Sequence, residues 1–281
     1  MRKVLVPTDF SDNAYNALKY ASQVFKYERS EFIILHTYAD EVYREEKTGK
    51  RASLEKLKRA TLESVEEKLG QIQADLRKYS PNPKHSYAFV PVFGGLIDAA
   101  NEWVNQENID IVVMGTRGAT NDRRTTFGTN TLQLMKYVQC PVLAVPEGYE
   151  YHPPKNVLFA SDLMLPFKRR ELKLLADMTG SFRSKVHVLY NNPVENLSFR
   201  QMDNKKFLQG CLQKTESIFT TTAEGDKTLA ITKYIEQSDI DMLAMINSRH
   251  SHLEDMLATS TIDQLGLHVK VPFMVMQNIA R

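Results

Sequence analysis

The sequence predicts an α/β protein built from two tandem doubly wound domains. Each domain is expected to hold an open five-stranded, mostly parallel sheet of order 3-2-1-4-5, with helices on both faces. Apolar strand-like runs alternate with helical patterns along the chain. These runs are almost continuously apolar, as in strands buried on both faces, and the whole pattern occurs twice within 281 residues.

An internal repeat sets the expected number of domains. Four segments of the first half return in order in the second half: residues 3–10 as 156–163, 33–36 as 186–189, 109–114 as 240–245, and 140–145 as 271–276. The second copy is shorter between its second and third strands. Residues 147–154, with a glycine, two tyrosines and two prolines, have the composition of a linker. We therefore expect domains at 1–146 and 155–281.

Hydrophobic periodicity places the elements of the first copy. The expected strands are residues 3–7, 31–37, 86–92, 109–114 and 141–145. The apolar stripes at helical spacing are Ala14, Ala17, Leu18, Ala21 and Phe25; Leu54, Leu57, Leu62, Val65, Leu69, Ile72 and Leu76; and Ile97, Ala100, Trp103 and Val104. The mixed charges of residues 41–78 are typical of a solvated helix face. The second copy lacks this stretch. An alternative is therefore that residues 41–78 form a movable cover or a surface that binds a partner.

The glycines after the fourth expected strand are the strongest indication of a ligand. Gly115 and Gly118 are followed, after nine residues, by Gly128 and Thr129, where a helix is expected to begin. Glycine lets backbone amides approach an anion, and the first turn of a helix has free amide donors. The spacing is not a Walker loop, because Phe127 precedes Gly128, and it is not a dinucleotide fingerprint. A flexible surface loop with a helix cap is the alternative.

The expected strand order places an acidic residue opposite this glycine loop. In such a fold the first and fourth strands are neighbours, and ligands bind beyond their carboxyl ends. Asp9 ends the first strand and Gly115 ends the fourth. Asp162 occupies the matching position in the second copy, which lacks the glycines. Asp9 therefore either contacts a ligand or caps the turn after its strand.

Composition limits the classes of function. The net charge of +2 implies no general binding of polyanions, so no nucleic-acid partner is expected. No apolar run reaches membrane-spanning length and the start lacks a signal-peptide core. We therefore expect no membrane partner and a cytoplasmic location. Cys140 and Cys211 match no metal or redox spacing and are expected to be small buried side chains.

Other polar residues allow two interpretations each. Arg123 and Arg124 either fold over a triphosphate or are solvated cations, and Asp122 either approaches a magnesium ion or is an exposed acid. The Arg-His-Ser-His stretch at 249–252 lacks the spacing of a metal site. His36 is expected to be hydrogen-bonded structure rather than a base. Because a Walker lysine and paired carboxylates at the cleft are missing, we expect no catalytic residue. We expect no metal site either, because the two histidines of residues 249–252 have no nearby cysteine and no HExxH spacing.

These motifs together resemble the universal stress protein family in its tandem-domain form. The segments similar to the family's first, second and last strands are 4–11, 35–37 and 140–145. The glycine spacing from Gly115 to Thr129 resembles that of the family's ATP-binding branch. The resemblance covers residues 1–146 and, more weakly, 155–277.

The resemblance implies a nucleotide site in the first domain, with ATP as the ligand and Mg²⁺ as its optional companion. The implied residues are Pro7, Thr8, Asp9 and Thr37 for adenosine; Gly115, Gly118, Gly128, Thr129 and Asn130 for ribose and phosphates; and Met114 and Arg117 alongside. The second copy has Ile246, Arg249, Thr259 and Ser260 where the first has its glycines. We therefore expect that the second domain does not bind ATP in the same way.

The function implied is that of an ATP-binding stress-response regulatory protein without strong hydrolase activity, and slow hydrolysis is left open. The two domains are expected to pair as an internal pseudo-dimer, through strands 141–145 and 271–275, and a homodimer is left open. The alternative is an interaction scaffold that binds no nucleotide and retains the glycine loop as a relic. A related group of adenine-nucleotide hydrolases is disfavoured by the sequence of residues 7–10.

Overall fold

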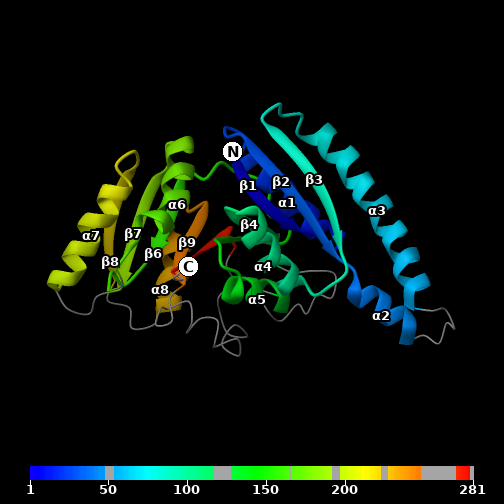
Figure 1. Cartoon of the computed structure of the whole chain (residues 1–281). Helices are drawn as coiled ribbons and strands as arrows, with labels where there is room; N and C mark the ends of the chain where they lie inside the picture. Colours follow the sequence, from blue (N-terminus) through cyan, green and yellow to red (C-terminus); the bar gives the residue numbers. More distant parts are fainter. Residues whose placement is uncertain are drawn as a thin grey trace. The chain divides into compact units, whose positions relative to one another are not determined.

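The computed structural model of the chain describes residues 1–47, 54–116, 128–164, 166–191, 197–222, 227–247 and 270–278. The chain forms two compact units and passes from the first to the second between Val142 and Leu143. Figure 1 shows strands with helices packed against them in each unit. The predicted fold class is confirmed, and the domain limits at 1–146 and 155–281 stay predictions.

The first half of the chain contains parallel strands in the predicted order. They are β1 (Arg2–Pro7), β2 (Ser30–Thr37), β3 (His85–Val92), β4 (Ile111–Gly115) and β5 (Val142–Val145). Their order is β3-β2-β1-β4-β5. β1 pairs in parallel with β2 and β4, and β2 pairs in parallel with β3. Val4, Leu5 and Val6 in β1 are fully buried, as expected for a central strand that is covered on both faces.

Helices connect these strands and cover both faces of the sheet. They are α1 (Asp12–Val24), α2 (Ala39–Lys47), α3 (Leu54–Tyr79), α4 (Leu96–Glu107) and α5 (Thr129–Tyr137). α1 packs on β1 and β4, and α3 packs on β3 and α1. α4 packs on β1, β2 and α5. Figure 1 shows α4 and α5 on one face of the sheet, and α1, which contacts α3, lies on the other.

The periodicity of α3 predicts most of its buried face. Leu57, Val65 and Leu69 are buried, whereas Leu54, the first residue of the helix, is exposed. The outer face carries mixed charges, among them an exposed pair in which Arg59 Nε lies 3.3 Å from Glu63 Oε1. The solvated-face interpretation of this stretch is therefore confirmed for the described part of the helix.

The second half of the chain repeats this order with shorter connections. Its strands are β6 (Asn156–Ala160), β7 (Lys185–Asn191), β8 (Glu216–Thr222), β9 (Met242–Asn247) and β10 (Phe273–Gln277), in the order β8-β7-β6-β9-β10. Its helices, within the described ranges, are α6 (Arg169–Phe182), α7 (Phe199–Cys211) and α8 (Lys227–Gln237). Between β7 and β8 the described residues form α7, whereas between β2 and β3 they form α2 and the long α3.

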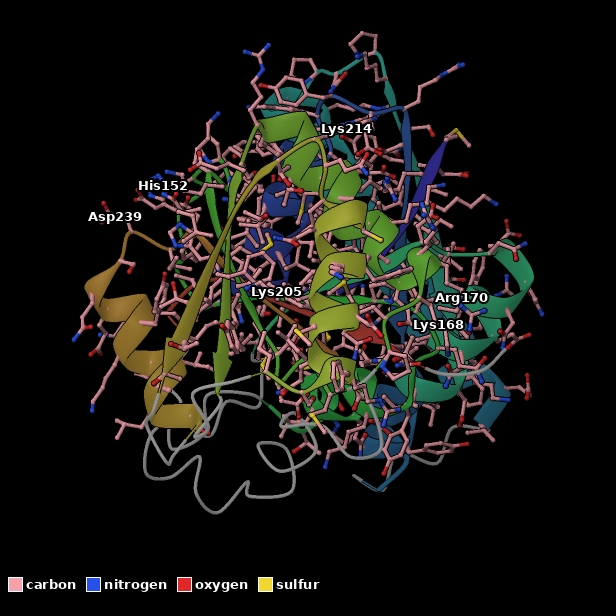
Figure 2. All side chains as sticks on the ribbon, turned by 90° about the vertical axis from the view of Figure 1, so that its left-hand side faces the viewer. His152, Lys168, Arg170, Lys205, Lys214 and Asp239 are labelled. Atoms are coloured by element: carbon pink, nitrogen blue, oxygen red, sulfur yellow. The ribbon has the colours of Figure 1, made fainter. Side chains whose placement is uncertain are left out.

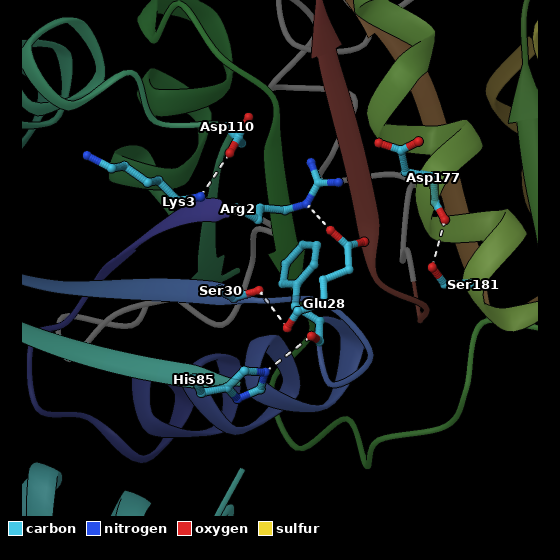
Figure 3. Close-up of polar contacts among 9 residues, drawn as sticks. Arg2, Lys3, Glu28, Ser30, His85, Asp110, Asp177 and Ser181 are labelled. Carbon is cyan, nitrogen blue, oxygen red and sulfur yellow. Dashed lines mark hydrogen bonds and ion pairs between the residues drawn. The ribbon is translucent and has the colours of Figure 1, made fainter. Parts of the chain in front are cut away.

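A repeated aspartate holds the start of the first strand in each unit. Lys3 N donates to Asp110 Oδ2 at 2.8 Å, as Figure 3 shows. In the second unit Lys155 N and Asn156 N both donate to Asp241 Oδ2, at 2.9 and 2.8 Å. The recurrence of Ile-Asp in the two sequence copies thus has a structural cause, away from the carboxyl ends of the strands.

Two expectations from composition can be compared with the structure. Cys140 is buried and Cys211 is partly buried, and both are free thiols. Among the helices of the described ranges, none combines the length and the apolar character that crossing a bilayer requires.

Candidate functional site

Parallel pairing of β1 with β4 brings the predicted site residues of the first unit to one edge of the sheet. Val4 lies opposite Ile111, and Leu5 lies opposite Val112. The ends of both strands therefore lie together, and β2 ends beside β1 on its other side. The predicted residues at these three ends are Pro7, Thr8, Asp9, Thr37, Met114 and Gly115. Arg117 and Gly118 lie outside the described residues.

The turn that follows β1 is held by its own polar groups. Phe10 N donates to Thr8 Oγ1 at 3.1 Å. Ser11 donates to Asp9 Oδ1 twice, from its backbone N at 3.1 Å and from its Oγ at 2.6 Å. Phe10 has a φ of 65°, in the left-handed region, and these contacts hold the chain there as it enters α1. The turn-capping role considered for Asp9 is confirmed, and a ligand contact stays a prediction.

The second unit builds the same turn with different side chains. Leu163 N donates to Ser161 Oγ at 3.1 Å, and Met164 N donates to Asp162 Oδ1 at 2.9 Å. Leu163 has a φ of 59°. Asp9 and Asp162 recur because both hold this turn, which explains why the aspartate is present in the copy without glycines.

Helix α1 lies so close to Gly115 that a side chain there would collide with it. A Cβ atom on Gly115 would lie 2.6 Å from Asn13 Nδ2 and 3.1 Å from the backbone oxygen of Asn13. Asn13 belongs to the first turn of α1 and is buried. Sequence reasoning missed Asn13, because a polar residue in a first helical turn gives no sign of the strand that it will contact. Packing alone therefore favours glycine at position 115.

The start of α5 is fixed to the end of β4 and carries no side-chain cap. Gly128 N donates to Thr116 O at 2.7 Å. Thr131 Oγ1 donates to the carbonyls of Gly115 and Thr116, at 3.0 and 3.1 Å. Gly128 is the N-cap residue, and among the described residues no side chain bonds the first-turn amides as a cap.

Thr129 and Asn130 are exposed in the first turn of α5. The helix therefore presents amide donors and the positive end of its dipole at this edge, an arrangement that suits an anion. Thr131, which anchors the helix start, is a further residue that sequence reasoning missed. Asp122, Arg123 and Arg124 lie outside the described residues.

His36 links the turn after β1 to helix α2. Its Nδ1 lies 2.7 Å from the carbonyl oxygen of Thr8, and its Nε2 lies 2.9 Å from Glu41 Oε1. The ring of Phe10 lies against the imidazole at a tilt of 39°, with 4.3 Å between ring centroids. Lys68 of α3 places its Nζ 5.1 Å from the centre of the Phe10 ring. The prediction that His36 is hydrogen-bonded structure is confirmed.

The corresponding edge of the second unit is occupied by its own polar side chains. Gln201 Nε2 donates to Asp162 O at 3.0 Å, and Asn204 Nδ2 donates to Leu163 O at 2.7 Å. Both donors come from α7. Lys168, labelled in Figure 2, donates to Asn278 Oδ1 at 2.8 Å.

The Lys168 ammonium also lies 3.4 Å from Oε1 of Glu171, whose side chain is almost fully buried. The cation at the start of α6 therefore already has a carboxylate partner within the chain. Ile246, the residue before the end of β9, stands where the first unit has Gly115. Arg249, His250, His252, Thr259 and Ser260 lie outside the described residues. Within the described ranges, no cluster of three or more side chains could hold a metal ion.

Comparison with known proteins gives relatives over both units. The profile of the universal stress protein family matches residues 1–146 and 193–277. Universal stress protein MJ0577 of Methanocaldococcus jannaschii is 27% identical over 156 residues, which are 51% of this chain and 94% of that protein.

Solved structures share the fold over nearly the whole chain. A universal stress protein from Archaeoglobus fulgidus matches with a TM-score of 0.68 and 17% identity, covering 98% of this chain and 96% of that one. The cytoplasmic domain of a prokaryotic cation chloride cotransporter matches with a TM-score of 0.52 and 10% identity, covering 98% of this chain and 95% of that one. The fold alone therefore does not decide a function. Because the family profile spans most of the sequence, the chain belongs to the universal stress protein family.

Proposed function

We propose that the first unit binds ATP or a closely related adenine nucleotide, and that the chain is a stress-response regulator rather than a strong hydrolase. The observation that carries the proposal is the uncapped start of α5 at Gly128, next to the buried end of β4. Amide donors at a helix N-terminus are a recurrent phosphate site in α/β folds. The glycine spacing from Gly115 to Thr129 resembles that of the family's ATP-binding branch.

The proposed ligand spans the edge of the first sheet. Its phosphates lie at Gly118, Gly128, Thr129 and Asn130, and Mg²⁺ accompanies them where it is bound. The purine lies near Thr8 and Thr37, the residues at the ends of β1 and β2. Asp9 contacts the adenosine and keeps its hydrogen bonds to Ser11 within the turn.

The proposal assigns one nucleotide to each chain, in the first unit. In the second unit Ile246 replaces the glycine at the end of the fourth strand. The amides of Gln201 and Asn204 already bond the turn after β6. Lys168 is paired with Glu171, so its charge is not available to a phosphate without the loss of that pair.

An interaction scaffold that binds no nucleotide is the second candidate. One specific observation favours it, namely that the contact between Asn13 and Gly115 accounts for the glycine without a ligand. A glycine required for packing would persist in a protein that had lost its nucleotide.

A calorimetric titration of the whole chain with ATP separates the two candidates. We expect one site per chain, with at least a tenfold loss of affinity in Gly118→Val and in Gly128→Val, because a valine side chain obstructs the phosphates. Gly70→Ala is the control, because a Cβ there has no neighbour within 4 Å. Equal affinity in all four proteins would exclude a phosphate site at these glycines, and two sites would contradict the asymmetry.

The two turn aspartates provide a second, matched control. Asp9→Asn and Asp162→Asn change the same local hydrogen bond in the two units. We expect similar small losses of stability in urea, whereas only Asp9→Asn weakens ATP binding. If wild type binds no ATP, and denaturation of the purified protein releases no nucleotide that absorbs as adenine, we conclude that the chain is an interaction scaffold.

A further inference from the structure

We propose that a second copy of this chain docks on strand β8, the outer strand of the second unit, and that the two β8 strands pair antiparallel about a twofold axis. This interaction surface does not depend on the nucleotide. β8 stands at the end of the strand order and pairs in parallel with β7 over its seven residues. Among the described residues, no other strand pairs with it.

The outer edge of β8 carries backbone groups that the pairing with β7 does not use. In a parallel pair, every second residue of a strand directs its N–H and C=O away from the neighbouring strand. About half of the β8 residues therefore direct backbone donors and acceptors to the outer side. An edge of this kind is a template on which another strand can pair.

Helices lie on both faces of β8, so the accessible part of the strand is its edge. On one face Lys205 of α7, labelled in Figure 2, places its Nζ 4.7 Å from the centre of the Phe219 ring. On the other face Ile218 lies opposite His187, whose ring contacts that of Tyr234 in α8. Ile218 is nevertheless 36% exposed. A strand added at the edge would cover part of this apolar side chain.

The outer strand of the first unit, β3, is protected against such pairing in a way that β8 is not. Native sheets discourage edge pairing with proline and with charged side chains. Pro91 lies within β3 and has no N–H to donate. β8 contains no proline and no lysine. Its one charged residue, Glu216, stands at its start, with Oε1 3.3 Å from Lys185 Nζ.

The sequence of β8 is compatible with pairing to itself. Antiparallel pairing that uses all seven residues is symmetric about the central residue, Phe219. The two Phe219 rings then lie across from each other, and aromatic cross-strand pairs are favourable. Glu216 lies opposite Thr222 of the partner subunit, so no like charges meet across the two strands. The partner that fits this edge is therefore a second copy of the chain.

One open edge leads to a closed pair rather than to a filament. A twofold contact uses the same surface on both copies, so neither β8 edge stays free. Pairing of β8 with β3 would instead continue from copy to copy, and Pro91 acts against it. A seven-residue strand pair is small for an interface, so we expect a dimer that dissociates at about 1–100 µM.

The test is sedimentation equilibrium of the whole chain at about 1–200 µM, under reducing conditions because both cysteines are free thiols. We expect a reversible equilibrium between monomer and dimer. The proposed register puts Ser217 opposite Thr221 of the partner subunit. Ser217→Lys combined with Thr221→Lys therefore brings two lysines together at each end of the pair. We expect the dissociation constant to rise about tenfold or more.

Ser217→Glu combined with Thr221→Lys is the matched variant. It changes the same two positions but sets a glutamate opposite a lysine, so we expect a dissociation constant close to that of wild type. Within one chain the two positions are about 13 Å apart along the strand, too far for an ion pair. Restored pairing therefore reports a contact between two chains. Ser86→Lys, at an exposed position of β3, is the control and should dimerise like wild type.

Three results of the sedimentation experiment would overturn the proposal. The first is a wild-type chain that stays monomeric up to about 200 µM. The second is a dimer that the two lysines leave unchanged, because its interface would then lie elsewhere on the chain. The third is loss of the dimer in both double variants, because antiparallel pairing at this register requires the glutamate and the lysine to restore it.

Hydrogen exchange of wild type tests the same surface without any substitution. The backbone amides of β8 that point outward should exchange more slowly above the dissociation constant than below it, because pairing gives them acceptors. The amides of β3 should exchange at the same rate at both concentrations. Slower exchange in β3 but not in β8 would overturn the assignment of the interface to β8, and so would unchanged exchange in both strands.

Discussion

The two units share one turn but hold it in different ways. In both, an aspartate oxygen accepts from the amide two residues later, and the intervening residue has a positive φ. In the first unit α1 begins at Asp12, soon after β1 ends, and lies against Gly115. In the second unit α6 begins only at Arg169, and Ile246 occupies the position of the glycine.

Comparing the two units distinguishes the residues that the fold requires from those that a ligand would require. Asp9 with Asp162, and Asp110 with Asp241, recur because each pair makes the same hydrogen bonds in both units. The close approach of α1 to Gly115 and the His36 contacts occur in the first unit, as does the uncapped start of α5, whose counterpart in the second unit lies outside the described residues. We therefore assign the shared contacts to stability, and the features of the first unit are the candidates for function.

The largest effect on stability is expected when Gly115 is replaced by a residue that has a side chain. The Cβ of Gly115→Ala would lie 2.6 Å from Asn13 Nδ2 and 3.1 Å from the Asn13 carbonyl oxygen. The side chain can rotate away but the carbonyl cannot, so we expect the free energy of unfolding to fall by about 1–3 kcal/mol. Urea denaturation measures the change.

Gly70→Ala is the matched control for that experiment. It changes a glycine inside α3 where a Cβ has open space, so we expect a gain of roughly 0.5–1 kcal/mol. If the free energy of unfolding of Gly115→Ala is not lower than that of Gly70→Ala, the packing argument is contradicted. The glycine would then have to be explained by a ligand.

A smaller effect is expected from removing the amide that holds the turn of the second unit. Asn204→Leu leaves the buried carbonyl of Leu163 without the donor that now lies 2.7 Å away. We expect a loss of about 1–2 kcal/mol in the free energy of unfolding. The exposed change Gln209→Ala on the same helix is the control and should cost only a few tenths of a kcal/mol. ATP affinity should not change in either variant, and a loss of affinity in Asn204→Leu would contradict the assignment of the site to the first unit.

The smallest expected effect is on the pH dependence of stability, to which one histidine in each unit contributes. Burial lowers the pKa of His187 in β7, with a further lowering from Lys185 and an opposing contribution from Glu216. Burial also lowers the pKa of His85 in β3, against a hydrogen bond to Phe25 O that raises it. Figure 3 shows the His85 ring at this bond. Both pKa values lie below those of the unfolded chain, so the unfolded chain takes up protons first.

Stability should therefore fall as the pH drops below about 6.5 and level off below the lowered pKa values. Urea midpoints at about pH 7.5 and pH 5.5 measure this loss. His187→Gln should lose less stability over this interval than wild type, because one titrating ring has been removed. An equal loss in both proteins would show that His187 does not contribute. We expect the change to be small because both rings are partly exposed.

The sequence alone determined the elements and their order. The apolar runs predicted a strand at 3–7, observed as Arg2–Pro7, and the repeat predicted that a second unit would return the same order. The spacing of Leu57, Val65 and Leu69 predicted the buried face of α3. These features are local along the chain, because a side chain's burial follows from the period of its own helix or strand.

Only the tertiary structure decided which polar groups meet. Asn13 reaches Gly115 because parallel pairing places the ends of β1 and β4 together. His36 connects Thr8 and Glu41, which belong to two other segments of the chain. Such contacts depend on strand register and helix placement, which are set by packing across the whole unit. The sequence around Asn13 or His36 therefore does not predict which residue each of them contacts.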